Sequence, residues 1–285
     1  MTALMLLSLL ASTAQSSVLE ANVRSIIAKS GAEVAVAYRT LDGTSELLID
    51  ADKPFHAAST MKVPVMIELF RQAEAGILKL DDPLPIRNEF RSIVDGSPYK
   101  LSEGDDSDAE VYAKVGKSMT LRELNEAMIT VSSNFATNLM IEKLDVEKVK
   151  ATVRRLGAGG RKVLRGVEDS KAFEKGLNNE TTARALLVLF EKLGKGQAVS
   201  ARSDREMVDV LKRQKFRDAI PAGLPAGTPV AHKTGNITRI QHDAGIVYGP
   251  RPYVLVVLVR GIQDADVSKA LIADISRVIW KHAGT

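Results

Sequence analysis

The 285-residue sequence contains no cysteine, so structural disulfides, thiol nucleophiles and thiolate metal ligands are excluded. Aromatic residues are also scarce, at 5% of the chain against 45% hydrophobic residues in total. The core must therefore be built mainly from aliphatic side chains. Beyond the N-terminal segment, no apolar run is long enough to form a stable membrane span.

Runs of basic residues interleaved with aromatic residues are absent, and the net charge is only +4, so nucleic-acid binding is not expected. The spacing of His, Asp and Glu indicates no zinc-type site, and we expect neither a metal nor a cofactor. The densest charged run is acidic and is interpreted as a solvated loop. It contains Glu103, Asp105, Asp106, Asp108 and Glu110.

The first residues have the pattern of a signal peptide. An apolar stretch from Leu4 to Ala11 is followed by the small residues Ser12-Thr13-Ala14. No Lys or Arg precedes the stretch, and a hydrophobic N-terminal helix is the alternative interpretation. We expect residues 1–14 to be a signal peptide and the mature protein to be exported, either periplasmic or secreted, and monomeric.

Strand-like alternation occurs near both ends of the chain, whereas helical spacing dominates the middle. The strand-like segments are residues 33–39, 46–49, 230–233, 243–248 and 253–260. Helical segments are residues 18–29, 266–281 and most of 59–214. The pattern predicts an α+β fold, with one antiparallel sheet built from both termini, flanking helices and an inserted all-helical domain. The expected domains are residues 18–55 plus 216–285, and residues 56–215.

Several helix boundaries are visible in the sequence. Thr120-Leu121-Arg122-Glu123 is a capping box, and Asp145 and Thr181 or Thr182 are predicted to begin two further helices. Two long loops, residues 88–118 and 165–180, separate these helices. Loops of this length in compact proteins are usually functional or mobile.

Ser59 and Lys62 form the first candidate catalytic pair. A serine in the first turn of a helix has the positive end of the helix dipole beside it, and a residue three positions later lies on the same face. A partly desolvated lysine can lose its proton near neutral pH and then accept the proton of the serine. The same spacing at Ser97 and Lys100 contains Pro98 and is predicted to be a loop, so it is rejected.

Two further motifs follow along the chain. In Ser132-Ser133-Asn134, a second hydroxyl could relay a proton and an amide could hold a substrate carbonyl; a simple helix cap is the alternative. Lys233-Thr234-Gly235 lies on a predicted strand, where Lys and Thr can bind a carboxylate and Gly permits close approach of a substrate. The alternative for Lys233-Thr234-Gly235, the third motif, is a surface Lys-Thr pair on an edge strand.

The three motifs occur together and in matching structural contexts, and from about residue 18 onward the chain resembles the class A β-lactamases and the wider penicillin-recognising serine enzymes. The resemblance implies a nucleophile at Ser59, a base at Lys62 and a proton relay at Ser132. It also implies an oxyanion hole formed by the backbone N–H groups of Ser59 and Asn236. The substrate-holding residues that it implies are Asn134, Lys233, Thr234 and Gly235, together with Arg239 for a substrate carboxylate.

The sequence departs from this family in the 165–180 loop. The family closes this loop with an Arg–Asp pair, and Arg165 and Glu180 stand at the matching ends. The position of the family's deacylating glutamate is occupied by Val167. Glu168 is the first candidate for the deacylation base and Glu174 the second, and the alternative is that both are solvated loop carboxylates. The middle residue of the second motif, usually Asp, is Ser133.

Three functions remain open: a β-lactamase, a penicillin-binding protein or sensor-like domain that stays acylated, and a related serine esterase or D-alanyl peptidase. The expected substrate is accordingly a small β-lactam or a peptidoglycan-like molecule. A Ser–His–Asp triad using His56, or the pair His242-Asp243, is a competing hypothesis, although the sequence has no Gly-x-Ser-x-Gly motif.

Overall fold

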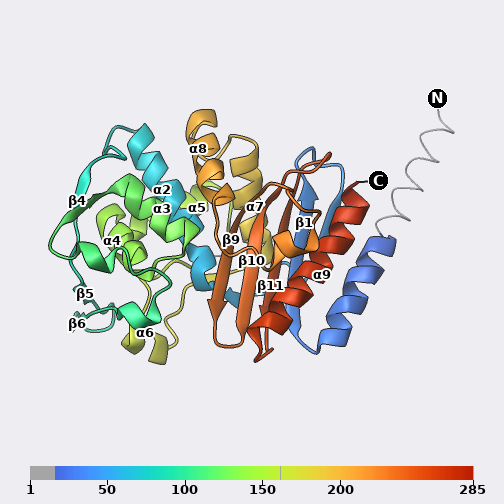
Figure 1. Cartoon of the computed structure of the whole chain (residues 1–285), viewed down its shortest axis with the longest axis horizontal. Coiled ribbons are helices and arrows are strands. Elements are labelled where there is room, and N and C mark those ends of the chain that lie inside the picture. Colours follow the sequence, from blue (N-terminus) through green and yellow to red (C-terminus); the bar gives the residue numbers. More distant parts are fainter. Residues whose placement is uncertain (1–16, 161, 285) are drawn as a thin grey trace.

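The computed structural model describes residues 17–160 and 162–284, so the expected signal peptide at residues 1–14 lies outside the described residues. The central element is a five-stranded antiparallel sheet with the strand order β2-β1-β11-β10-β9 (Figure 1). Its strands are β1 (Glu33–Thr40), β2 (Glu46–Ile49), β9 (Val230–Ile237), β10 (Ile240–Val247) and β11 (Tyr253–Arg260). Since β1 pairs with β11 along its whole length, the prediction of a sheet built from both ends of the chain is confirmed.

The two faces of the sheet belong to two hydrophobic clusters, because side chains alternate along each strand. Val34, Val36 and Tyr38 of β1 pack with the helix at residues 17–30 and with α9 (Ala265–Ala283). The small residues Ala35 and Ala37 face the other cluster, which continues into the helical part of the chain. Figure 1 shows α9 and the N-terminal helix side by side along the sheet.

The segment between β2 and β9 is mainly helical. It contains η1 (Ala58–Met61), α2 (Lys62–Glu74), α3 (Leu121–Thr130), α4 (Asn134–Leu144), α5 (Val146–Arg155), α6 (Ser170–Glu174), α7 (Ala183–Gly194) and α8 (Ala201–Lys212). The capping box at Thr120 is present, and Asp145 and Thr182 cap α5 and α7 as expected. α7 lies against β1, β10 and β11, and so connects the helical part to the sheet.

Short strand pairs within the helical part differ from the sequence-based expectation. They are β3 (Phe55–His56) with β8 (Glu180–Thr181), β4 (Pro83–Pro85) with β7 (Ser118–Thr120), and β5 (Phe90–Arg91) with β6 (Pro98–Tyr99). Strands of two or three residues are too short to show alternation, which explains why they were not predicted. In the described part of the chain, no helix combines the length and apolarity needed to cross a bilayer.

β9 extends four residues beyond the predicted strand and includes Lys233, Thr234, Gly235 and Asn236. Its partner β10 begins at Ile240, so Thr238 and Arg239 form the turn between the two strands. Gly235 and Asn236 have low strand propensity, but pairing along β10 overrides it here. The extension brings the third sequence motif alongside η1, which carries Ser59.

Candidate active site

Ser59 lies in η1, one turn before Lys62 opens α2, and the end of β9 packs beside it. A side chain on Gly235 would place its Cβ 3.2 Å from the backbone nitrogen of Ser59 and 3.2 Å from the Cβ of Ala58. The absence of that side chain therefore allows β9 to approach the candidate nucleophile closely. This is the position in which N–H groups of η1 and β9 could face the same substrate oxygen.

The backbone is strained at three points around Ser59. Ala58, Ser132 and Glu168 have φ values of 44°, 61° and 60°, a region that non-glycine residues rarely adopt. Each of these residues either flanks Ser59 or is itself a candidate catalytic residue. Such strain is typical of functional sites, where the surrounding structure holds residues in unfavourable conformations.

Lys62 and Ser132 are in direct contact. The Nζ atom of Lys62 donates to the carbonyl oxygen of Ser132 at 2.6 Å, to its Oγ at 3.1 Å and to Oδ1 of Asn134 at 2.8 Å. Lys233 donates to the same Ser132 Oγ at 3.0 Å. The structure therefore brings together the predicted base, the predicted proton relay and two of the predicted substrate-holding residues.

Burial shifts the pKa values of both lysines. Complete burial lowers the pKa of Lys62 to about 7, although the negative charges of Asp106 and Glu168 act in the opposite direction. Burial and the neighbouring Lys62 lower the pKa of Lys233 well below its usual value, while Asp243 opposes the shift. At neutral pH, Lys62 can thus exist as a free amine that accepts a proton.

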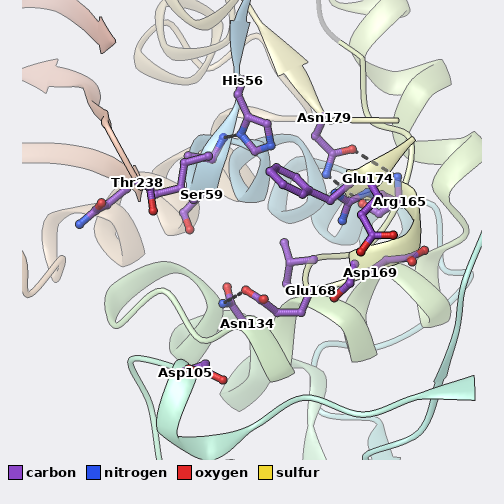
Figure 2. A pocket seen from close by; sticks show the side chains of 16 residues that line it. His56, Ser59, Asp105, Asn134, Arg165, Glu168, Asp169, Glu174, Asn179 and Thr238 are labelled. Carbon is purple, nitrogen blue, oxygen red and sulfur yellow. Dashed lines mark hydrogen bonds between the residues drawn. The ribbon is translucent and has the colours of Figure 1, made fainter. Parts of the chain in front are cut away.

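Asn134 connects the lysine to the 165–180 loop. Its Nδ2 donates to Oε1 of Glu168 at 3.1 Å while its Oδ1 accepts from Lys62 (Figure 2). Partial loss of surrounding water and the nearby carboxylate of Asp105 raise the pKa of Glu168, although the residue is exposed to solvent. A base with a raised pKa, held across the cleft from Ser59, is suited to activate a water molecule.

Asp106, which the sequence placed in a solvated loop, has a specific structural role. Its two carboxylate oxygens accept hydrogen bonds from the backbone nitrogens of Asn134 and Phe135, each at 2.9 Å. A negative charge at the N-terminus of α4 is stabilised by the helix dipole. Asp106 thereby fixes the orientation of Asn134, and no local sequence signal identified this contact.

Two adjoining cavities, of about 550 and 430 Å³, lie on either side of Ser59. Ser59, Asp105, Asn134 and Asn236 line both cavities. The larger cavity is bounded by the 165–180 loop and includes Glu168 and Glu174; the smaller includes Ser132 and Thr234. Together the cavities form one cleft in which Ser59 occupies the middle.

The two residues at the ends of the 165–180 loop do not pair with each other. Glu180 forms an ion pair with Lys162 at 2.8 Å, whereas Arg165 donates to the carbonyl oxygen of Leu177. Instead Oδ1 of the buried Asn179 accepts from the backbone nitrogens of Leu164 and Arg165, and its Nδ2 donates to the Arg165 carbonyl. An uncharged amide thus joins the two ends of the loop.

Val167 is fixed by Asn138, a residue that the sequence did not single out. Asn138 accepts from the Val167 nitrogen at 2.7 Å and donates to the Val167 carbonyl at 2.9 Å. Val167 lines the larger cavity between Arg165 and Glu168 and also packs against the hydrophobic core. An apolar residue therefore borders the cleft at the position where the family resemblance predicts a glutamate.

The competing Ser–His–Asp hypothesis finds no geometric support in the described residues. Nδ1 of His56 accepts a hydrogen bond from the Ala58 nitrogen, and Nε2 of His242 lies 2.9 Å from the His56 carbonyl oxygen. Asp243 instead pairs with the buried His232, 2.9 Å away. These histidines support the segment before Ser59 and the strand behind Lys233.

Arg239 does not reach the cleft in this structure. Its guanidinium donates to the carbonyl of Gly261 at 2.9 Å, and its neighbours Ile237 and Thr238, but not Arg239 itself, line the larger cavity. The rejected serine, Ser97, donates to Asp95 on an exposed turn. Within residues 17–160 and 162–284, no group of three or more His, Asp or Glu residues is arranged to bind a metal.

Comparison with known sequences identifies related proteins. The model of the β-lactamase enzyme family matches residues 18–283. The β-lactamase of Bacillus licheniformis is 32% identical over 181 residues, and the match covers 59% of this chain and 57% of that protein. The match to the β-lactamase of Streptomyces albus G covers 55% of that protein. The chain thus spans little more than half the length of these two relatives. β-Lactamase AST-1 of Nocardia asteroides is 30% identical, with 82% of this chain and 74% of the relative covered.

Solved structures show the same fold. An ancestral class A β-lactamase superimposes with a TM-score of 0.80 at 26% identity, covering 92% of this chain and 99% of the other. PBP-A also gives a TM-score of 0.80 at 26% identity, covering 92% of this chain and 94% of that protein. A single-residue mutant of PBP-A is known as an acyl-enzyme complex with penicillin G and matches with the same TM-score and identity.

Proposed function

The chain belongs to the class A β-lactamase family, and we propose that it opens β-lactam amides through an acyl-enzyme ester on Ser59. One observation carries the proposal: Lys62 is buried, has a pKa of about 7 and donates to both Ser132 Oγ and Asn134 Oδ1. A lysine in this environment is available as a base at neutral pH.

In the acylation step, Lys62 accepts the hydroxyl proton of Ser59 and Ser59 Oγ attacks the lactam carbonyl. The backbone N–H groups of Ser59 and Asn236 stabilise the developing oxyanion, supported by the close approach of β9 to η1 at Gly235. The ring C–N bond then breaks, and Ser132 delivers a proton to the leaving nitrogen. Lys233, which donates to Ser132, and Thr234 bind the substrate carboxylate.

For deacylation, we propose that Glu168 activates the hydrolytic water. Its raised pKa, its hydrogen bond to Asn134 and its place in the lining of the cavity next to Ser59 support this role. Glu174 lines the same cavity and is the second candidate. The water would attack the ester carbonyl, and Ser59 would recover its proton as the product acid leaves.

A second candidate function is a penicillin-binding protein that acylates without fast turnover, or a related serine esterase or D-alanyl peptidase. The specific observation in its favour is Val167, an apolar residue that borders the cleft at the expected glutamate position. The fold likeness to PBP-A is equal to that with the ancestral β-lactamase, so the fold does not discriminate between these functions.

The deciding experiment is to incubate the protein with a chromogenic cephalosporin and to follow both product release and protein mass. Sustained turnover with a transient adduct on Ser59 supports a β-lactamase. A stoichiometric adduct without turnover supports the penicillin-binding alternative. Complete absence of an adduct would favour an enzyme acting on other esters or peptides.

We also propose that the protein is exported, because Leu4 to Ala11 and the following small residues have the pattern of a signal peptide. N-terminal sequencing of protein recovered from the periplasm or the medium should begin after residue 14. Recovery of uncleaved protein from the cytoplasm alone would contradict export.

A further inference from the structure

The two cavities beside Ser59 differ in their linings, which assigns the two ends of a substrate. The smaller cavity contains Ser132 and Thr234, which both contact the buried Lys233, and Lys269, whose ammonium pairs with Asp218 in the same lining. This is the end that can bind the carboxylate of the leaving part of a substrate. The acyl group that remains on Ser59 must then extend into the larger cavity.

The larger cavity is acidic. Four carboxylates line it, against the single guanidinium of Arg165. Arg165 is buried and donates to the carbonyl oxygens of Leu177 and Gly166. Its charge acts on Asp169 and Glu168, but no ion pair joins it to Asp105 or Glu174 among the described residues. Of the four carboxylates, Glu168 is bound to Asn134, and the buried Asp169 accepts from Ser92 and Ile93.

The remaining two carboxylates, Asp105 and Glu174, have no hydrogen-bond or ion-pair partner among the described residues, and both are exposed. Asp105 stands where the two cavities meet Ser59, and Figure 2 shows it on the loop next to Asn134. Apolar surface lies beside them: Phe173 and Ile237 line the cavity with 58% and 37% of their surfaces exposed. The cavity thus offers apolar contact together with uncompensated negative charge.

We propose that Asp105 and Glu174 make the enzyme selective for substrates whose acyl group carries an ammonium ion. This inference rests on the proposed acylation of Ser59 and adds the substrate class. An ammonium group in the larger cavity gains attraction from both free carboxylates, whereas a carboxylate at the same position is repelled. The apolar side chains contact the hydrocarbon part of the same group.

Three penicillins provide a matched test, since they differ only at the α-carbon of a phenylacetyl group. Ampicillin has an amine there, benzylpenicillin a hydrogen and carbenicillin a carboxylate. The second-order rate constant for Ser59 acylation is measured by intact mass at about pH 6, where α-amino groups are protonated and carboxylates ionised. The expected order is ampicillin, benzylpenicillin, carbenicillin, with the fastest first.

Asp105→Asn and Glu174→Gln should each reduce the ampicillin-to-carbenicillin ratio by about two- to fivefold, the effect of one exposed charge pair. The matched control is Glu110→Gln, which removes a charge from the same acidic run outside the cavity linings and should leave the ratio unchanged. An ampicillin-to-carbenicillin ratio near one in the unaltered protein would overturn the inference. An equal fall of this ratio in Glu110→Gln would also overturn it, and in both cases the acylation of Ser59 itself would still stand.

Failure of all three penicillins to acylate Ser59 would instead overturn the proposed function. In that case, the selectivity of the larger cavity is measured with two acylaminomethylboronic acids, one whose acyl group carries an amine and one whose acyl group carries a carboxylate. Boronic acids bind a serine oxygen and need no lactam ring. Tighter binding of the amine, weakened by Asp105→Asn, supports the inference. Equal binding of the two boronic acids rejects it.

Discussion

Lys62 and Lys233 donate hydrogen bonds to the same atom, Ser132 Oγ, at 3.1 and 3.0 Å. A serine oxygen has two lone pairs and can accept both bonds, which leaves its own proton free to be donated. Both lysines are fully buried, and two ammonium groups on one oxygen repel each other. Burial is the main cause of the lowered pKa of both lysines, and the charge of Lys62 adds to the lowering at Lys233. A neutral Lys62 is what its proposed role as a base requires.

The first prediction concerns the pH dependence of acylation. Lys62 must be neutral to accept the Ser59 proton, and its pKa is about 7. The acylation rate constant should therefore fall about tenfold per pH unit below 7 and level off above it. Stopped-flow acylation from about pH 5 to pH 9 measures this profile.

Lys62→Arg provides the comparison, because a guanidinium stays protonated throughout this range and cannot act as a base. We expect acylation to fall by about 100-fold or more in this variant, consistent with loss of general-base catalysis. A profile that stays flat through neutral pH in the unaltered protein would exclude Lys62 as the titrating base.

The second prediction separates two neighbouring serines. Ser132→Ala removes the oxygen that both lysines share and should slow acylation by about 100-fold. Ser133 instead caps α4, its Oγ accepting from the Ala136 nitrogen. Ser133→Ala should lower the free energy of unfolding by about 1 kcal/mol and affect acylation far less.

Acylation kinetics and chemical denaturation of both variants measure these effects. Equal losses of acylation rate in the two variants would mean that Ser132 acts only through the fold of this turn.

The third prediction concerns the release of the acyl group. Glu168→Gln should slow deacylation by about 100-fold and let the Ser59 adduct accumulate, because the amide cannot accept a proton from water. Glu174→Gln, which alters a carboxylate in the same cavity, should deacylate at close to the original rate. Pre-steady-state burst kinetics and intact mass spectrometry measure the amount of adduct on Ser59. Unaltered turnover in Glu168→Gln would mean that Glu168 takes no part in deacylation.

The fourth prediction concerns the closure of the 165–180 loop. Asn179→Ala removes three hydrogen bonds to Leu164 and Arg165 and should lower the free energy of unfolding by about 2–3 kcal/mol. Asn178→Ala, the neighbouring amide, removes a long contact of 3.4 Å to Arg165 and a hydrogen bond with His56, and should cost about 1 kcal/mol or less. Urea denaturation measures both, and similar losses would argue against Asn179 as the closing residue.

Local and repeated signals explain what the sequence could predict. The caps at Thr120, Asp145 and Thr182 involve only neighbouring residues, so their pattern is readable in one dimension. The short apolar run of β11 is likewise a local pattern, typical of a strand that is covered on both faces. Spacing and order of motifs were sufficient to propose Ser59 and Lys62 as the candidate catalytic pair.

Contacts between distant segments explain what was missed. Asp106 binds Asn134 and Phe135 across a separation of 28 and 29 residues, and an exposed acidic run gives no indication of such a partner. Asn179, rather than Glu180, closes its loop because the position of each side chain depends on the short β3–β8 pairing. The strain at Glu168 likewise arises from the fold around it rather than from its own residue type.

The pairing of β1 with β11 has a consequence for biosynthesis. A growing chain presents Ser59 and Lys62 early, but Lys233 can reach Ser132 only after β9 has paired with β10, β10 with β11, and β11 with β1. The last strands made thus complete a sheet begun by the first, a non-local order that slows folding. A labelled β-lactam added during translation should therefore mark only finished molecules, with reactivity appearing as a single late event.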